Sequence, residues 1–74
     1  MSEIDPIYEA IGFRVRDLRQ DWRISQNALA TRTHLPIGRI EMGMEPITIP
    51  ALYTIARALY CSVYTLLPEK EEQP

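Results

Sequence analysis

The sequence predicts an all-α fold, a compact arrangement of five short helices around one core. Five helix starts are marked by a capping residue or a proline, at Asp5, Ser25, Pro36, Thr48 and Ser62. Each is followed by apolar residues at helical spacing, and no stretch alternates as a strand would. A chain of 74 residues corresponds to one domain, which buries only about 60% of its unfolded surface, so a partner would add usefully to its stability.

The first helix is predicted from residue 6 to about residue 23. Asp5 is a capping acid and Pro6 suits the first helical position. One apolar face then recurs in steps of three and four residues, comprising Ile7, Ile11, Val15, Leu18 and Trp22. Gly12 lies inside this helix and costs about 1 kcal/mol relative to alanine. Close packing against a neighbouring helix would explain it.

Two shorter helices follow. Ser25 caps the second helix over "QNALATRT", in which the small Ala30 lets another helix approach closely. The stretch "HLP" interrupts it, and Pro36 opens a third helix over "PIGRIEM". Two isoleucines three residues apart mark the buried face of the third helix, and Gly43 ends it.

The fourth helix is capped by Thr48 and tolerates Pro50 in its first turn. Its predicted buried face comprises Leu52, Ile55, Ala56 and Leu59. Ser62 caps a last helix over "VYTLL", which Pro68 stops. The predicted organisation is an N-terminal arm over residues 1–5, one domain over residues 6–68, and an acidic, disordered tail over residues 69–74.

Charge is distributed unevenly along the chain. The formal net charge is −2, yet residues 7–68 carry seven arginines against five acidic residues, a net charge of +2. All basic residues of that part are arginines, which suit forked contacts with phosphate or base edges. Arg14, Arg16, Arg23 and Arg32 could each grip phosphate, although for each alone a solvated side chain or a pair with a nearby acid such as Asp17 or Asp21 is the commoner outcome.

The sequence does not support an enzyme, a zinc-binding protein or a membrane protein. The chain has no glycine-rich phosphate loop, no nucleophile with a histidine and an acid, and no paired carboxylates, so neither an enzyme nor a cofactor is expected. His34 and Cys61 are the only residues of their types and are too few for a zinc site; Cys61 is expected to be buried filler. The apolar stretches are too short to span a membrane and no targeting signal is visible. A cytoplasmic protein is therefore expected.

The order and spacing of four stretches resemble the lambda repressor and Cro family of helix-turn-helix DNA-binding domains. They are "IGFRVRDLR", "ISQNALA", "IGRIEMG" and "TIPALYTIARALYCSVYTLL", within residues 11–67. The resemblance implies a compact five-helix domain that binds double-stranded DNA. It also implies an ion pair of Arg19 with Glu41 that ties the first helix to the third. By the same resemblance Gln26 touches phosphate and braces the recognition helix, and Arg39 is exposed late in that helix.

The sequence departs from the family most clearly at the third helix. About three residues are missing between Gln26 and Glu41, at the front of this helix, where family members keep most base-reading side chains. Pro36 and Gly38 at that end carry no side-chain donor, so only Arg39 keeps a reading group. We therefore expect a weak reader, a reader that docks in an altered way, or a domain with another task.

Two further departures concern loops and helix ends. Met44, Glu45 and Pro46 stand where family members often have Lys, Arg or Asn, and a glutamate near phosphate repels it. Arg23 and Tyr60 stand where the family favours glycine at a helix end, so a positive φ there would be strained.

The sequence is compatible with two functions. The first is a repressor-like DNA-binding regulator that is expected to act as a homodimer, with two third helices about 34 Å apart. Its predicted DNA-binding residues are Ser25, Gln26, Asn27, Arg32, Pro36, Gly38 and Arg39. The second is a module that binds itself or another protein, with weak or no DNA binding. Its predicted contact patch comprises Trp22, Tyr53, Tyr60 and Tyr64, whose alternative is ordinary partial burial.

Overall fold

The computed structural model describes residues 4–68, which form five α-helices and no strand. The helices are α1 (Pro6–Asp21), α2 (Gln26–Thr33), α3 (Ile37–Glu41), α4 (Ile49–Ala58) and α5 (Val63–Leu66). The predicted all-α class and helix order are confirmed. The predicted tail over residues 69–74 and the first three residues of the predicted arm lie outside the described residues.

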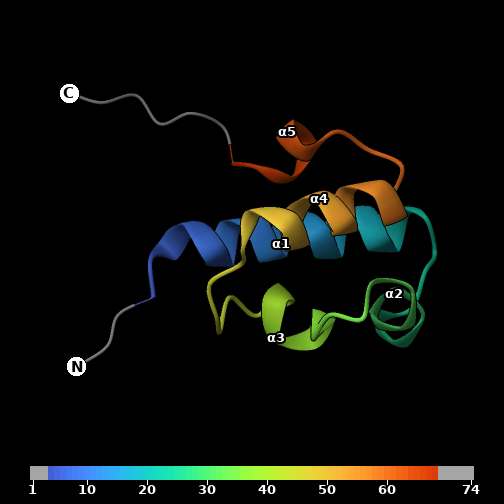
Figure 1. Cartoon of the computed structure of the whole chain (residues 1–74), viewed down its shortest axis with the longest axis horizontal. Coiled ribbons are helices and arrows are strands. Elements are labelled where there is room, and N and C mark those ends of the chain that lie inside the picture. Colours follow the sequence, from blue (N-terminus) through green and yellow to red (C-terminus); the bar gives the residue numbers. More distant parts are fainter. Residues whose placement is uncertain (1–3, 69–74) are drawn as a thin grey trace.

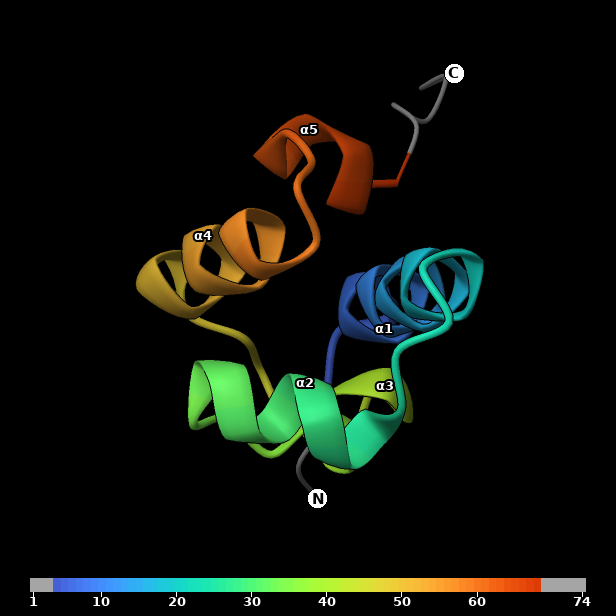
Figure 2. The ribbon, with the colours of Figure 1, turned by 90° about the vertical axis from the view of Figure 1, so that its right-hand side faces the viewer.

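The five helices surround one core (Figure 1). Figure 2 looks nearly along α1 and α4, with α5 above them and with α2 and α3 below. α1 packs against α3 and α5, while α2 packs against α3 and α4. The core comprises Ile11, Val15, Leu29, Ile37, Ile40, Leu52, Ile55, Ala56, Leu59 and Leu66. The buried faces predicted for the third and fourth helices are therefore confirmed.

The apolar face of α1 is buried only in its middle. Ile11 and Val15 are buried, but Ile7 is 41% exposed and Trp22 is 52% exposed. The predicted apolar face of the first helix is therefore buried at Ile11 and Val15 but not at its two ends. α1 has 16 residues, whereas α3 and α5, which pack on it, have five and four. At about 1.5 Å per residue the short helices cannot cover the whole length of the long one.

Side-chain caps begin four of the helices as predicted. Asp5 accepts a hydrogen bond from the amide of Ile7, and Ser25, Thr48 and Ser62 each cap their own helix in the same manner. α3 differs, because Pro36 lies at the N-cap, offers no side-chain oxygen, and precedes the first helical residue. The predicted helix over residues 36–42 is thus one residue shorter at each end.

Three helices end in a left-handed residue that is not glycine. φ is +58° at Arg23, +59° at His34 and +57° at Tyr60. Arg23 and Tyr60 each follow the last turn of a helix with the paired backbone hydrogen bonds of a Schellman motif. A positive φ is thus present at both positions where the sequence raised that question, and at His34 as well; strain at Arg23 and Tyr60 stays a prediction.

Replacing Arg23 with glycine is expected to stabilise the domain relative to alanine at the same position. Alanine keeps the Cβ atom that disfavours a positive φ, while glycine removes it, a difference of about 1 kcal/mol. Both variants lose the exposed arginine side chain, so charge is matched. Urea unfolding followed by circular dichroism measures the difference, and equal midpoints would contradict the assignment of strain.

Two remaining expectations concern single features. Cys61 is half-buried and packs against the core, and this burial raises the pKa of its thiol. It is filler, as predicted, but not fully enclosed. Within residues 4–68 none of the helices combines the length and the apolar character needed to cross a membrane.

Candidate nucleic-acid interface

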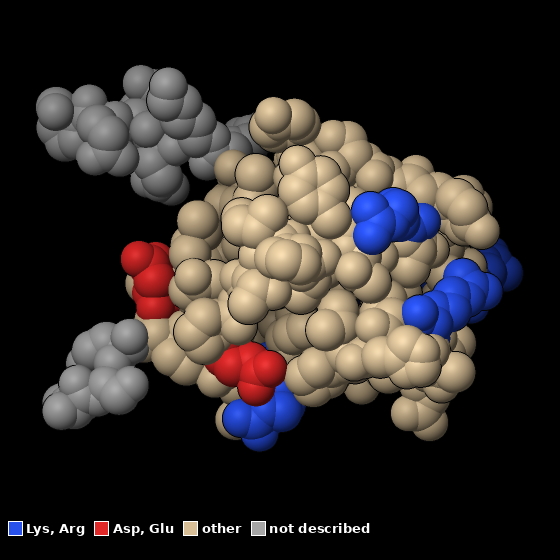
Figure 3. All heavy atoms as spheres, viewed as in Figure 1, with Lys and Arg blue, Asp and Glu red and all other residues tan. Residues whose placement is uncertain are grey.

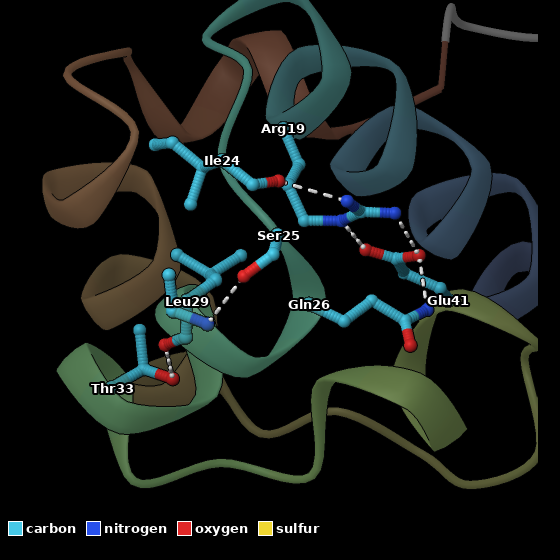
Figure 4. A network of polar contacts seen from close by, with 8 residues as sticks. Arg19, Ile24, Ser25, Gln26, Leu29, Thr33 and Glu41 are labelled. Carbon is cyan, nitrogen blue, oxygen red and sulfur yellow. Dashed lines mark hydrogen bonds and ion pairs between the residues drawn. The ribbon is translucent and has the colours of Figure 1, made fainter.

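A part-buried polar network joins three helices at the N-terminus of α2 (Figure 4). Arg19 of α1 donates from Nε to Oε2 of Glu41 over 2.6 Å and from Nη2 to Oε1 over 3.1 Å. Its Nη1 donates to the carbonyl oxygen of Ile24 over 2.9 Å. Gln26 Nε2 donates to Oε1 of the same carboxylate over 2.9 Å. One guanidinium thus fixes α1, the turn before α2, and the end of α3.

The ion pair at the centre of this network is largely shielded from water, whereas Gln26 at its edge is exposed. The side chain of Arg19 is 11% exposed and that of Glu41 is 3% exposed. The hydrogen bond to Glu41 raises the pKa of Arg19 more than burial lowers it, so the guanidinium stays charged. The predicted ion pair is confirmed, and it acts as a strut that sets the position of α3.

Gly12 lets α1 lie directly on the backbone of α3. A Cβ atom at this position would overlap the carbonyl oxygen of Ile40 and lie 2.8 Å from that of Glu41. The close approach inferred from this glycine is confirmed. The close approach also brings Glu41 within reach of Arg19, which lies about two helical turns after Gly12 in α1.

The turn between α2 and α3 is fixed by its own contacts. His34 takes the left-handed conformation after α2. Thr33 is buried, and its Oγ1 donates to the carbonyl oxygen of Leu29 over 2.8 Å and accepts from the amide of Leu35 over 3.3 Å. Ile37 and Ile40 then anchor α3 in the core. α2 and α3 therefore form a helix-turn-helix unit of defined geometry.

The outer side of α3 offers one charged side chain. Glu41 turns inward, and Gly38 is half-buried without a side chain. Arg39 points outward with a side chain that is 57% exposed, and its Nε lies 2.9 Å from Oε1 of Glu45. The shortening predicted for the third helix is confirmed at five residues. The pairing with Glu45 was missed, although Gly43 indicated a reversal that could bring these residues together.

The structure separates the predicted DNA-binding residues into two groups. Gln26 is drawn into the network of Arg19 and Glu41, so its amide nitrogen is already engaged. The others stand apart from that network: Ser25, Asn27, Arg32, Pro36 and Arg39 are exposed and Gly38 is half-buried. Ser25 uses its hydroxyl oxygen to cap α2.

A hollow of about 300 Å³ lies beside the network. Its lining comprises Arg16, Arg19, Gln20, Gln26, Glu41 and Met42. Two arginines against one carboxylate give it a net positive charge, and the side-chain amides add neutral donors. Sequence reasoning had considered Arg16 for phosphate contact but had not considered Gln20.

Charge is also uneven on the outer surface. On the face shown in Figure 3, most basic side chains lie at the right-hand end, over α2 and the end of α4, and another lies at the lower left edge beside an acidic side chain. Acidic side chains on this face lie in its left half and lower edge. Within residues 4–68 no group of three or more His, Cys, Asp and Glu residues is placed to hold a metal ion.

The four aromatic residues of the predicted contact patch lie outside the core. Trp22 and Tyr60 meet edge to face, with ring centroids 5.7 Å apart and planes at 60°. Tyr53 is 51% exposed, Tyr60 75% and Tyr64 82%. Partial burial, the alternative considered for this set, fits the half-exposed Trp22 and Tyr53 but not Tyr60 and Tyr64, which are mostly exposed. Among the described residues only Trp22 and Tyr60 are joined by a ring contact.

Comparison with known proteins finds solved structures with a similar fold. Neither a protein-family model nor a curated protein matches the chain. Among solved structures it is similar to the restriction-modification controller protein C.AhdI from Aeromonas hydrophila, with 26% identity, a TM-score of 0.75, and coverage of 82% of this chain and 96% of that chain. The clp gene regulator ClgR from Corynebacterium glutamicum is 24% identical, with a TM-score of 0.78 and coverage of 86% and 71%.

The DNA-binding domain of BldD is a third neighbour, 22% identical, with a TM-score of 0.76 and coverage of 92% of this chain and 100% of that domain. These neighbours are a controller protein, a gene regulator and a DNA-binding domain, and none is described as an enzyme. By its fold, the chain is a helix-turn-helix domain similar to these neighbours and to the lambda-repressor type, with a third helix of five residues.

Proposed function

We propose that this protein is a DNA-binding transcription regulator that docks α2 and α3 on duplex DNA. The observation that carries the proposal is the Arg19–Glu41 strut, joined by Gln26, which holds a short helix with an outward arginine beside α2. The similarity in fold to a controller protein, a gene regulator and a DNA-binding domain supports it. A repressor-like role in the cytoplasm fits this assignment.

Each predicted contact residue has a task in this proposal. Ser25 and Arg32 contact the phosphate backbone, and the amides at the start of α2 face a phosphate with the helix dipole behind them. Gln26 and Asn27 stand at the edge of the groove. The basic hollow beside Gln26, lined also by Arg16, receives a phosphate oxygen.

The short α3 makes the contact with bases small. Pro36 and Gly38 allow the backbone to come close to the duplex but supply no donor, which leaves Arg39 to read a base edge. A single copy would therefore discriminate poorly between sequences. We propose a homodimer, in which two copies of α3 lie about 34 Å apart and double the number of reading groups. The exposed Trp22–Tyr60 pair is the proposed contact between the copies.

The test is a titration of labelled duplex DNA at several salt concentrations. Binding should weaken steeply with salt, because bound arginines release counterions from phosphate. Arg32→Ala should lower the slope of log affinity against log salt by about 1. Arg57→Ala is the matched control, since it removes an exposed arginine from α4 and should leave the slope unchanged. Binding that is absent or indifferent to salt would contradict the proposal.

A second candidate is a module that binds itself or another protein. Two observations favour it, namely the shortness of α3 and the exposure of Trp22, Tyr60 and Tyr64. It predicts self-association that Tyr64→Ala abolishes, together with weak or absent DNA binding. Sedimentation analysis of the unaltered protein and of Tyr64→Ala measures self-association. Together with the DNA titration, it separates the two functions.

A further inference from the structure

The ion pair of Arg39 with Glu45 lies on the outer edge of α3. The two side chains are 57% and 36% exposed, and the contact joins Nε to Oε1 over 2.9 Å. An exposed pair of this kind adds little to the stability of a fold. Its effect is instead on where the guanidinium of Arg39 points.

The loop that carries Glu45 is fixed in place by its backbone. Gly43 has a φ of +69°, its amide donates to the carbonyl oxygen of Ile40, and the amide of Met44 donates to that of Arg39, both over 3.0 Å. These are the two hydrogen bonds of a Schellman motif, which folds the chain back over the last turn of α3. Pro46 further restricts the backbone of Glu45 to extended conformations.

α1 holds the same loop from the other side. A Cβ atom at Gly43 would lie 2.6 Å from the Cα atom of Glu9, so the loop lies against the backbone of α1. Glu45 therefore reaches Arg39 from a loop that is anchored on two helices. The position of the carboxylate is a property of the fold and does not depend on a free loop finding it.

The pair leaves the reading end of Arg39 open. Glu45 occupies Nε, and within residues 4–68 no other group accepts a hydrogen bond from this side chain. The two terminal nitrogens, Nη1 and Nη2, remain as two parallel donors. Two such donors match the O6 and N7 acceptors that guanine presents in the major groove.

We propose that Glu45 is a positioning residue that holds Arg39 for bidentate reading of one guanine. The proposal rests on the proposed function, that α3 docks on duplex DNA. Because α3 has no other outward charged side chain, its discrimination between bases depends on this orientation. Without Glu45 the long arginine side chain is free to turn to the nearest phosphate, which strengthens binding to every sequence and reads none. Glu45 thus lowers the affinity for DNA of any sequence and raises the discrimination between sequences.

The experiment begins with selection of duplexes from a randomised library by the full-length protein. In the selected duplex each guanine is then replaced, one at a time, with 7-deazaguanine, which lacks the N7 acceptor. For the unaltered protein one replacement should weaken binding about tenfold. Glu45→Gln should bind the selected duplex at least as tightly as the unaltered protein does. Replacing that guanine with 7-deazaguanine should weaken the binding of this variant by less than about threefold. Arg39→Ala should be insensitive to the replacement.

Matched controls separate positioning from charge and from folding. Asp17→Asn makes the same change in net charge at an exposed residue that forms no ion pair within residues 4–68, and it should keep the tenfold effect. Thermal unfolding of Glu45→Gln should match that of the unaltered protein, because the pair is exposed.

The outcomes distinguish this inference from the proposed function. If the unaltered protein does not bind duplex DNA at all, both are overturned. Salt-dependent binding in which no sequence is selected, or in which no guanine replacement matters, overturns the inference alone. So does a Glu45→Gln variant that keeps the full tenfold penalty, since Glu45 would then only compete with DNA for Arg39.

Discussion

Glu41→Ala is expected to destabilise the domain by about 3–5 kcal/mol, a large part of the stability available to a chain of this size. The substitution leaves the guanidinium of Arg19, which is only 11% exposed, without its carboxylate partner. Gln26 loses the acceptor for its side-chain amide as well. Urea unfolding followed by circular dichroism should show the loss as a large shift of the midpoint.

Two further variants show whether the unpaired charge causes this loss. Glu45→Ala removes the carboxylate of the exposed pair and should cost less than about 1 kcal/mol. The double variant Arg19→Met with Glu41→Leu removes both charges and should recover most of the stability, because no buried charge is left alone. If Glu41→Ala cost no more than Glu45→Ala, the buried network would not be what holds α3.

The parts of the fold that could be predicted are those determined locally. Asp5, Ser25, Thr48 and Ser62 cap their helices because a short side-chain oxygen reaches an amide two or three residues ahead, whatever lies elsewhere in the chain. The Arg19–Glu41 pair spans 22 residues, and periodicity alone does not reveal it. The family resemblance implied it, and the structure confirms it.

The parts of the fold and of the site that could not be predicted depend on which helix or loop covers each side chain. Helical spacing places Trp22 on the same face as Val15, but it cannot show that the helices packed on α1 stop short of Trp22. The hydrogen bond of Gln26 to Glu41 agrees with the expected bracing of the third helix, whereas its contact with phosphate stays a prediction. The contact of Arg39 with Glu45 arises from the chain reversal at Gly43, which brings together residues that no helical spacing would pair.

Gly12→Ala is expected to destabilise the domain by about 3 kcal/mol or more, although alanine is the better helix former by about 1 kcal/mol. The added methyl group would overlap the carbonyl oxygen of Ile40 and lie 2.8 Å from that of Glu41. Both are backbone atoms of α3 and cannot rotate away, so α3 must move outward from α1. That movement also pulls the carboxylate of Glu41 from Arg19, which adds part of the cost of the broken network.

Gly38→Ala provides the matched control within the helix that Gly12 contacts. An added Cβ atom at Gly38 would meet only Oε1 of Gln26, at 3.6 Å, which is an ordinary contact. The same substitution should therefore stabilise the domain there by up to about 1 kcal/mol through helix propensity alone. Opposite signs for the two variants in urea unfolding would show that backbone contact, and not glycine itself, determines the effect. A stabilising Gly12→Ala would mean that α1 and α3 are not in direct backbone contact, and the position assigned to α3 would then be wrong.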